Sequence, residues 1–265
     1  MTDKLVGDGL VLLDLDADGV GHLRLNRPEA SNGMNVEFLR ALHDAILAAH
    51  GEPRLRVLLL SGEGPNFCAG GDVKTFASKG ADLPDYLRQA TSWLQACVQG
   101  LLSLQAPVHG YAAGGGGFGL VCASDLVVAG ESARFLAGAT RVGMAPDAGV
   151  SVTLPLLVGL RKALDIILTN PVLTAAEALE IGLITRVVPD DELAAQSLAL
   201  ARSLAGGATR ALGAAKRLVW SGLGARVEAQ LPEEARTVSE LSGTADAREG
   251  LAAVIERRAP VFGGR

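Results

Sequence analysis

The order of strand-like and helix-like segments constrains the fold of this chain more than any other feature. Residues 11–26 alternate apolar and polar side chains on both sides of an Asp-Gly pair, which predicts a β-hairpin. Apolar residues recur at helical spacing over 36–50, and the apolar run 55–62 predicts a short buried strand. A second helix is predicted over 84–104, before a strand-like segment at 107–111.

Three more β-like segments follow, at 125–130, 133–138 and 140–144, and helices then dominate the chain. Thr174 with Glu177 three residues later has the pattern of a helix capping box. The remaining predicted elements are a strand at 183–188 and helices at 160–168, 192–204, 211–219 and 245–257. Strands and helices alternate over about the first 150 residues, and helices take over in the last 110 or so. The prediction is an α/β protein with a helical C-terminal part, which we divide into a core, 1–200, and a C-terminal helical region, 201–265.

Composition excludes several classes of function. A net charge of -5 with no basic stripe argues against a nucleic-acid partner. No apolar run approaches the roughly 20 residues that span a bilayer, and the first residues do not resemble a signal peptide, so we expect a cytoplasmic protein without a membrane partner. Three cysteines without paired spacing predict neither disulfides nor a zinc site, and the four histidines show no metal-binding pattern.

Four consecutive glycines, 114–117, interrupt a segment that is otherwise apolar. Glycine is favoured where another group must approach the main chain closely. Gly114, Gly116 and Gly119 match the spacing of a dinucleotide-binding loop, but that loop belongs in the first strand–helix turn of a nucleotide-binding unit, with an acidic residue about 20 positions later. Asp125 and Glu131 come too early for this role, and no Lys-Ser or Lys-Thr follows as in a P-loop. Close packing of backbone against backbone remains a simpler alternative.

A second glycine-rich stretch, residues 62–76, changes the interpretation of the first. Here a predicted strand ends, and Gly70, Gly71 and Asp72 lead into a predicted helical turn. Two loops with exposed glycine N–H groups, each opening a helix, suit a site in which two backbone donors converge on one developing oxyanion.

These motifs together resemble the crotonase superfamily, the enoyl-CoA hydratase/isomerase family, over nearly the whole chain. The matching segments are 25–35, 66–74, 106–129, 133–159 and 249–265, together with the stretch EALEIGLITRVVPDDEL. The resemblance implies a crotonase-like ββα spiral core of small perpendicular sheets and a C-terminal α-helical region for oligomerisation, usually into trimers or pairs of trimers. It also implies a CoA thioester as the ligand, with no separate cofactor.

The resemblance assigns roles to individual residues. Gly71 matches the first oxyanion-hole position, and the second falls on Gly115 or Gly116, of which Gly116 keeps the frame of the following helix. Other matches concern the CoA moiety: Ala30, Ala69, Asp72 and Val73 around the pantetheine and adenine, and Arg257 at its phosphates, with Arg27 and Lys74 as further candidates for the phosphates. For these three cations a solvated surface role is an equal alternative.

The sequence departs from the family pattern at the two glutamates that hydratases use to activate water and deliver a proton. The first position falls on Gly119, or on Phe118 in the other frame, and the second falls on Ala139. Residues 106–124 contain no Asp or Glu, so no change of frame restores the pair. Ordinary hydratase activity is therefore not expected.

One carboxylate remains in the right region, Asp147 in MAPDAGVS. Some family isomerases carry an acid at this place, including the Δ3,Δ2-enoyl-CoA isomerases and the phenylacetate-pathway ring-epoxide isomerases. Isomerisation needs one proton carrier, whereas hydration needs two. The sequence therefore predicts an enoyl-CoA isomerase whose catalytic groups are Asp147, Gly71 and Gly116. The alternatives are a hydratase-like activity, a non-catalytic acyl-CoA binder, and for Asp147 itself a role as a helix N-cap.

Overall fold

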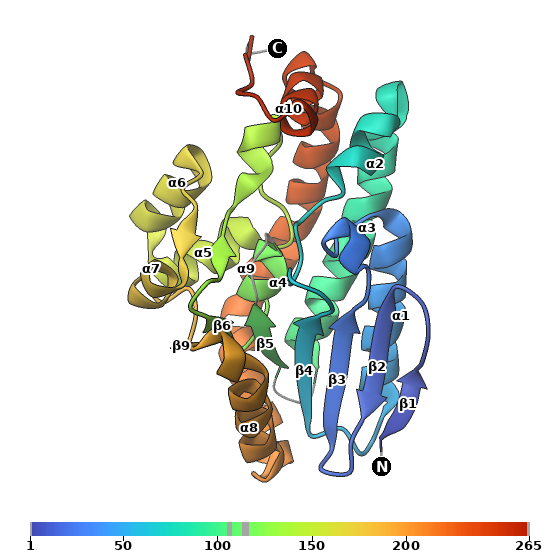
Figure 1. The fold of residues 1–265 in the computed structure, drawn as a ribbon, viewed down its shortest axis with the longest axis vertical. Helices are drawn as coiled ribbons and strands as arrows, with labels where there is room; N and C mark the ends of the chain where they lie inside the picture. Colours follow the sequence, from blue (N-terminus) through green and yellow to red (C-terminus); the bar gives the residue numbers. More distant parts are fainter. Residues whose placement is uncertain (1, 105–107, 113–116, 264–265) are drawn as a thin grey trace.

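A seven-stranded sheet organises the chain in the computed structural model, which describes residues 2–104, 108–112 and 117–263 (Figure 1). The sheet order is β1-β2-β3-β4-β5-β6-β9. Its strands are β1 (Asp3–Val6), β2 (Val11–Leu15), β3 (Val20–Leu25), β4 (Val57–Gly62), β5 (Val108–Ala112), β6 (Leu126–Gly130) and β9 (Arg186–Val188). The first three strands pair antiparallel, and the pairs from β3 to β9 are parallel.

The hairpin predicted at 11–26 is confirmed as β2 and β3. The carboxylate of Asp16 accepts hydrogen bonds from the N–H groups of Asp18 and Val20, both at 2.9 Å. Gly19 has a φ of 82°, which only glycine adopts without strain. The turn therefore forms from interactions among neighbouring residues.

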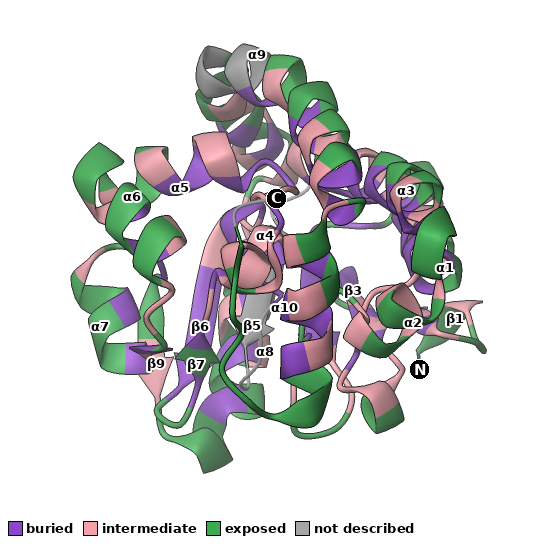
Figure 2. Cartoon of the chain, turned by 90° about the horizontal axis from the view of Figure 1, so that it is seen from above, coloured by how far each residue is buried: buried purple, intermediate pink, exposed green. Residues whose placement is uncertain are grey.

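Helices cover both faces of the sheet (Figure 1). Helix α1 (Val36–Gly51) and helix α3 (Leu83–Ser103) pack against each other, and their apolar sides join the main core with the side chains of β2 and β3. Helix α8 (Leu193–Ala205) closes the opposite face, where Ala201 and Ala205 pack on Val57 and Leu59. Figure 2 shows the buried residues concentrated between these layers. The helices predicted at 36–50 and 84–104 are confirmed as α1 and α3.

A smaller part of the chain, between β6 and β9, carries a two-stranded sheet and several short helices. Its elements are β7 (Arg134–Phe135), β8 (Leu173–Thr174), the 3-10 helix η3 (Gly138–Val142), α5 (Val150–Val158), α6 (Leu160–Thr169) and α7 (Ala175–Glu180). The predicted capping box is present: the Thr174 hydroxyl accepts from the Glu177 N–H, and Glu177 accepts from the Thr174 N–H. The strand predicted over 140–144 is wrong, because η3 occupies most of it and Gly143 caps η3 with a φ of 71°.

The C-terminal part consists of α8, α9 (Thr209–Ser242) and α10 (Ala245–Glu256). Helix α9 is 34 residues long, far beyond the predicted 211–219. Its extension was missed because glycines and Pro232 interrupt the local helical pattern. The predicted boundary after residue 200 falls inside α8. The remaining short elements are α2 (Val73–Ser78), α4 (Phe118–Cys122), η1 (Pro28–Ala30), η2 (Gly80–Asp82) and η4 (Asp190–Glu192).

Candidate active site

The two glycine-rich loops emerge beside each other because β4 and β5 are adjacent and parallel. The first loop follows the carboxyl end of β4 and leads into α2, and the second follows β5 and leads into α4. Gly117, at the end of the second loop, lies so close to the first that a Cβ atom there would come within 2.7 Å of the Cys68 Cβ. The two loops are therefore in contact at this point. Gly115 and Gly116 lie outside the described residues.

Gly71 lies in the first loop between residues whose N–H groups are hydrogen-bonded. The flanking groups are used: Ala69 N–H donates to Ser31, and Asp72 N–H donates to Met34 at 2.9 Å. Within the described part of the chain, Gly71 N–H has no hydrogen-bond acceptor, and the residue is exposed and borders a cavity. An exposed, unpaired amide of this kind can donate to an oxyanion.

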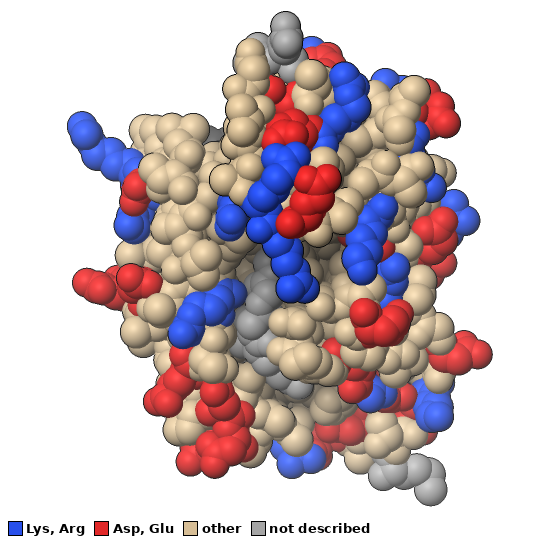
Figure 3. All heavy atoms as spheres, turned by 45° about the horizontal axis from the view of Figure 1, so that its top comes forward, with Lys and Arg blue, Asp and Glu red and all other residues tan. Residues whose placement is uncertain are grey.

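The cavity has a volume of about 540 Å³ and lies beyond the carboxyl ends of the strands. Figure 3 shows a hollow on this side of the molecule with Lys and Arg side chains beside it. Its walls are largely apolar and come from many elements, including Met34, Phe76 of α2, Leu87 and Leu94 of α3, Phe118 of α4, Val142 and Met144 around η3, Val238 of α9 and Leu251 of α10. Such a lining suits an apolar acyl group.

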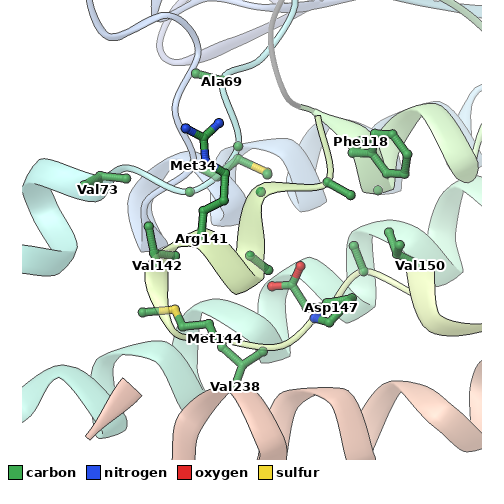
Figure 4. A pocket seen from close by; sticks show the side chains of 18 of the residues that line it. Met34, Ala69, Val73, Phe118, Arg141, Val142, Met144, Asp147, Val150 and Val238 are labelled. Atoms are coloured by element: carbon green, nitrogen blue, oxygen red, sulfur yellow. The ribbon is translucent and has the colours of Figure 1, made fainter. Parts of the chain in front are cut away.

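Asp147 is the one acidic residue among the described residues that line this cavity. Its carboxylate points into the cavity among the side chains of Met144, Val150 and Val238 (Figure 4). Burial, with a smaller contribution from the negative charge of Glu234, raises the pKa of Asp147 to about 7. A carboxyl group with a pKa near neutrality can both remove and return a proton under physiological conditions.

Asp147 does not cap the following helix, so the alternative structural role is wrong. Helix α5 begins at Val150, its N-cap position is Gly149, and no side chain of its own caps it. Glu234 of α9 caps the helix instead. Its carboxylate accepts hydrogen bonds from the N–H groups of Gly149 at 2.6 Å and Ser151 at 3.0 Å. Glu234 is only 4% exposed. Sequence reasoning missed this residue, because it lies more than 80 positions from the loop that it holds.

The residues that the sequence comparison matched to the hydratase glutamates lie in the wall of the same cavity. Phe118, Gly119 and Ala139 all belong to its lining, and none of them can carry a proton. A Cβ atom on Gly119 would lie 2.3 Å from the Cβ of Ala148, so α4 packs tightly against the Asp147 loop. The backbone arrangement therefore leaves no room for a glutamate at residue 119.

The residues assigned to CoA fall into two groups. Ala69 and Val73 line the cavity, whereas Ala30 and Asp72 do not. The Asp72 carboxylate accepts from the N–H and hydroxyl of Thr75 and pairs with Arg27 at 2.7 Å. Burial raises the pKa of Asp72, but the hydrogen bonds from Thr75 and Arg27 lower it by more. The pKa therefore lies below its usual value. The side chains of Asp72 and Arg27 thus stabilise the first loop.

Two cations proposed for the CoA phosphates remain exposed. Arg257 follows α10 with a φ of 55°, and Lys74 lies on α2; neither lines the cavity. No described group of three or more His, Cys, Asp or Glu residues could hold a metal ion. No helix among the described residues is long and apolar enough to cross a membrane.

Comparison with known proteins places this fold and site in a family. A sequence profile described as enoyl-CoA hydratase/isomerase matches residues 16–265. A probable enoyl-CoA hydratase of Rhodobacter capsulatus is 38% identical over 250 residues, covering 94% of this chain and 96% of the relative. The 1,2-epoxyphenylacetyl-CoA isomerase of Escherichia coli is 35% identical over 253 residues, which cover 93% of this chain and 96% of the relative.

A crystal structure of an enoyl-CoA hydratase from Mycobacterium avium subsp. paratuberculosis superposes with a TM-score of 0.86 at 28% identity, covering 96% of this chain and 98% of that one. The fold and site thus define an acyl-CoA enzyme of the crotonase superfamily. The chain belongs to the enoyl-CoA hydratase/isomerase family, which confirms the predicted family and fold class.

Proposed function

We propose that the protein is an enoyl-CoA isomerase that moves a double bond along the acyl group of a CoA thioester. The observation that carries this proposal is a single aspartate, Asp147, whose pKa is raised to about 7 by burial in a largely apolar cavity. Gly71, whose N–H has no acceptor among the described residues, lines the same cavity. The relative named 1,2-epoxyphenylacetyl-CoA isomerase supports an isomerase assignment.

In the proposed mechanism, the thioester oxygen accepts a hydrogen bond from Gly71 N–H and a second one from Gly116 or Gly115 of the other loop. Ionised Asp147 removes a proton α to the thioester carbonyl, and the negative charge moves onto the thioester oxygen, where the two amides stabilise it. Protonated Asp147 then returns the proton at the γ carbon, which leaves the double bond conjugated with the carbonyl. One carboxyl group acts as base and acid in turn, and no cofactor beyond the CoA of the substrate takes part.

The contacts with CoA are part of the same proposal. Ala69 and Val73 border the cavity and would lie along the pantetheine, with Ala30 and Asp72 in the loops behind them. Arg257 is an exposed cation that would meet a phosphate. We place the enzyme in the cytoplasm, because Cys68, Cys97 and Cys122 are all buried free thiols, as is usual in a reducing compartment.

A hydratase-like activity is the second candidate, because relatives of this chain are named hydratases. Hydration needs one group to activate water and another to protonate the α carbon, and the described cavity lining offers a single acidic residue. A non-catalytic acyl-CoA binder is the third candidate.

The assay that separates these candidates uses two thioesters with the unaltered protein. We expect a 3-enoyl-CoA to be converted to the conjugated 2-enoyl-CoA, seen as growth of the absorbance of the conjugated thioester. We expect crotonyl-CoA to keep that absorbance, because no second proton carrier is available. Loss of the crotonyl-CoA absorbance would identify a hydratase, and no turnover of any straight-chain or ring-bearing enoyl-CoA would identify a binder.

We further propose that three copies of the chain assemble, alone or as a pair of trimers. Large apolar side chains are exposed along α5, α6 and α7, where they would be costly in a free monomer. They are Leu156 (41%), Leu157 (41%), Leu160 (65%), Leu164 (46%), Leu168 (68%) and Leu179 (41%). Figure 2 shows the outer sides of α6 and α7 as exposed.

Replacing both Leu160 and Leu168 with Asp is expected to reduce the mass in solution from a multiple of three chains to the 27.2 kDa of one chain. Two buried carboxylates at an interface would be unpaired, which strongly opposes association. Light scattering after size exclusion measures the mass. Leu47→Asp on α1 is the matched control, since Leu47 is 54% exposed on a different helix. A parent protein that is monomeric at micromolar concentration would contradict the proposal.

A further inference from the structure

We propose that Glu234 is a positioning residue for Asp147: it holds the turn that carries the aspartate and places a second negative charge behind it. The inference rests on the proposed function, since it assumes that Asp147 is the base. Glu234 lies on α9 and is not among the residues that line the cavity, so it does not reach the substrate. Its influence is exerted through Asp147.

The contacts of Glu234 explain how the turn is held. Both carboxylate oxygens accept backbone N–H groups, from Gly149 at 2.6 Å and from Ser151 at 3.0 Å. These are first-turn N–H groups of α5, which no side chain of the turn itself satisfies. The turn needs such support because Ala148 has a φ of 56°, a left-handed conformation that costs a residue with a side chain about 1 kcal/mol or more.

The charges around Asp147 show why Glu234 has an electrostatic effect as well. The described cavity lining includes two cations, Arg134 and Arg141, and both are exposed. Arg141 extends toward Met34 and away from Asp147 (Figure 4). From α10, Asp246 lies beside Gly143 and accepts the N–H of Gly263, so its carboxylate is directed toward the chain end.

Glu234 is therefore the charged residue that acts on Asp147 from outside the cavity lining. Among the described residues, its negative charge raises the pKa of Asp147 in addition to the effect of burial. Burial also raises the pKa of Glu234, while the N–H groups of Gly149 and Ser151 act in the opposite direction by favouring its ionised form. An ionised Glu234 disfavours a second negative charge on Asp147, which keeps the base protonated to higher pH and makes it stronger.

The experiment is a pH titration of the Asp147 carboxyl carbon by NMR, using protein labelled with carbon-13 at the side-chain carboxyl groups of aspartate and glutamate. Asp147→Asn identifies the resonance. Glu234→Gln removes the charge but keeps one amide oxygen as an acceptor, and it is expected to lower the Asp147 midpoint by about one pH unit. The pH profile of 3-enoyl-CoA isomerisation should shift by the same amount. Glu233→Gln is the matched control, because Glu233 is the adjacent acid on α9 but is exposed and pairs with Arg236.

A measurement on the parent protein covers the case in which Glu234→Gln does not fold. The Glu234 carboxyl carbon is expected to titrate at lower pH than that of Asp147, because Glu234 opposes the ionisation of Asp147 only when it is already ionised itself. An unchanged Asp147 midpoint in Glu234→Gln would overturn the proposal, as would an equal shift in Glu233→Gln or a Glu234 that stays protonated while Asp147 ionises. These titrations do not depend on turnover. If the parent protein does not isomerise any thioester but Glu234→Gln lowers the Asp147 midpoint, the proposed function fails while the coupling of Glu234 to Asp147 stands.

Discussion

Asp147→Asn is expected to lower the rate of 3-enoyl-CoA isomerisation by about 10²- to 10⁴-fold, the usual contribution of a positioned general base. The amide has nearly the same shape as the carboxyl group but cannot take up the proton. Because Gly71 and the apolar walls are untouched, affinity for CoA thioesters should change little. Stopped assays measure the rate, and calorimetry with a non-reactive acyl-CoA measures the affinity. Asp44→Asn, at a side chain that is 68% exposed, is the control.

Retained turnover in Asp147→Asn would remove the aspartate from the mechanism. The parent enzyme should show a rate that rises as the pH increases through about 7, because the ionised form of Asp147 is the base and burial raises its pKa to about that value. A profile that is flat from pH 5 to pH 9 would contradict this assignment.

The same substitution has an opposite effect on stability. The pKa of Asp147 is raised from 3.8 to about 7 in the folded protein, so the folded state binds a proton more tightly than the unfolded state between these values. This contribution to stability is fully present below about pH 3.8 and is lost as the pH rises through about 7. Asp147→Asn cannot develop the charge. Its free energy of unfolding, measured with urea, should therefore exceed that of the parent by roughly 1–3 kcal/mol at pH 8. The difference should be smaller at pH 5.

Gly71→Ala is expected to lower kcat by about 10²- to 10³-fold, because it disturbs a donor to the oxyanion. A Cβ atom at residue 71 would lie 2.4 Å from the Cε2 atom of Phe76, so either the loop or the ring must move. The effect should fall on kcat more than on KM, since the oxyanion exists only beyond the ground state. Steady-state kinetics with a 3-enoyl-CoA makes the measurement.

Two further variants identify the cause of the lower kcat in Gly71→Ala. Phe76→Ala combined with Gly71→Ala removes the clash and should restore part of the lost rate. Gly51→Ala is the matched control, because a Cβ atom there meets nothing within 4 Å. Equal kcat in Gly71→Ala and the parent would show that the Gly71 amide does not serve the reaction.

Local patterns predicted those elements whose stabilising contacts come from neighbouring residues. In the hairpin of β2 and β3, Asp16 accepts hydrogen bonds from residues only two and four positions later in the chain. In α7, the capping box joins Thr174 to Glu177. The pair of glycine loops could also be predicted, because each follows a strand and adjacent parallel strands end at the same edge. Asp147 was predicted as the base because the two hydratase glutamates are missing and it is the remaining carboxylate in that region. The structure places it in the lining of the cavity.

Long-range contacts decided the rest. Residues 138–142 form a 3-10 helix and not a strand, because Val142 packs directly against Gly250 of α10, which no local pattern reveals. Glu234 caps α5 from a distant helix and puts its charge beside Asp147. The sequence alone thus predicted the family, most of the strands and the identity of the proposed base. Only the tertiary structure decided how strong that base is, because a pKa depends on burial and on charges brought close by folding, and neither can be read from spacing along the chain.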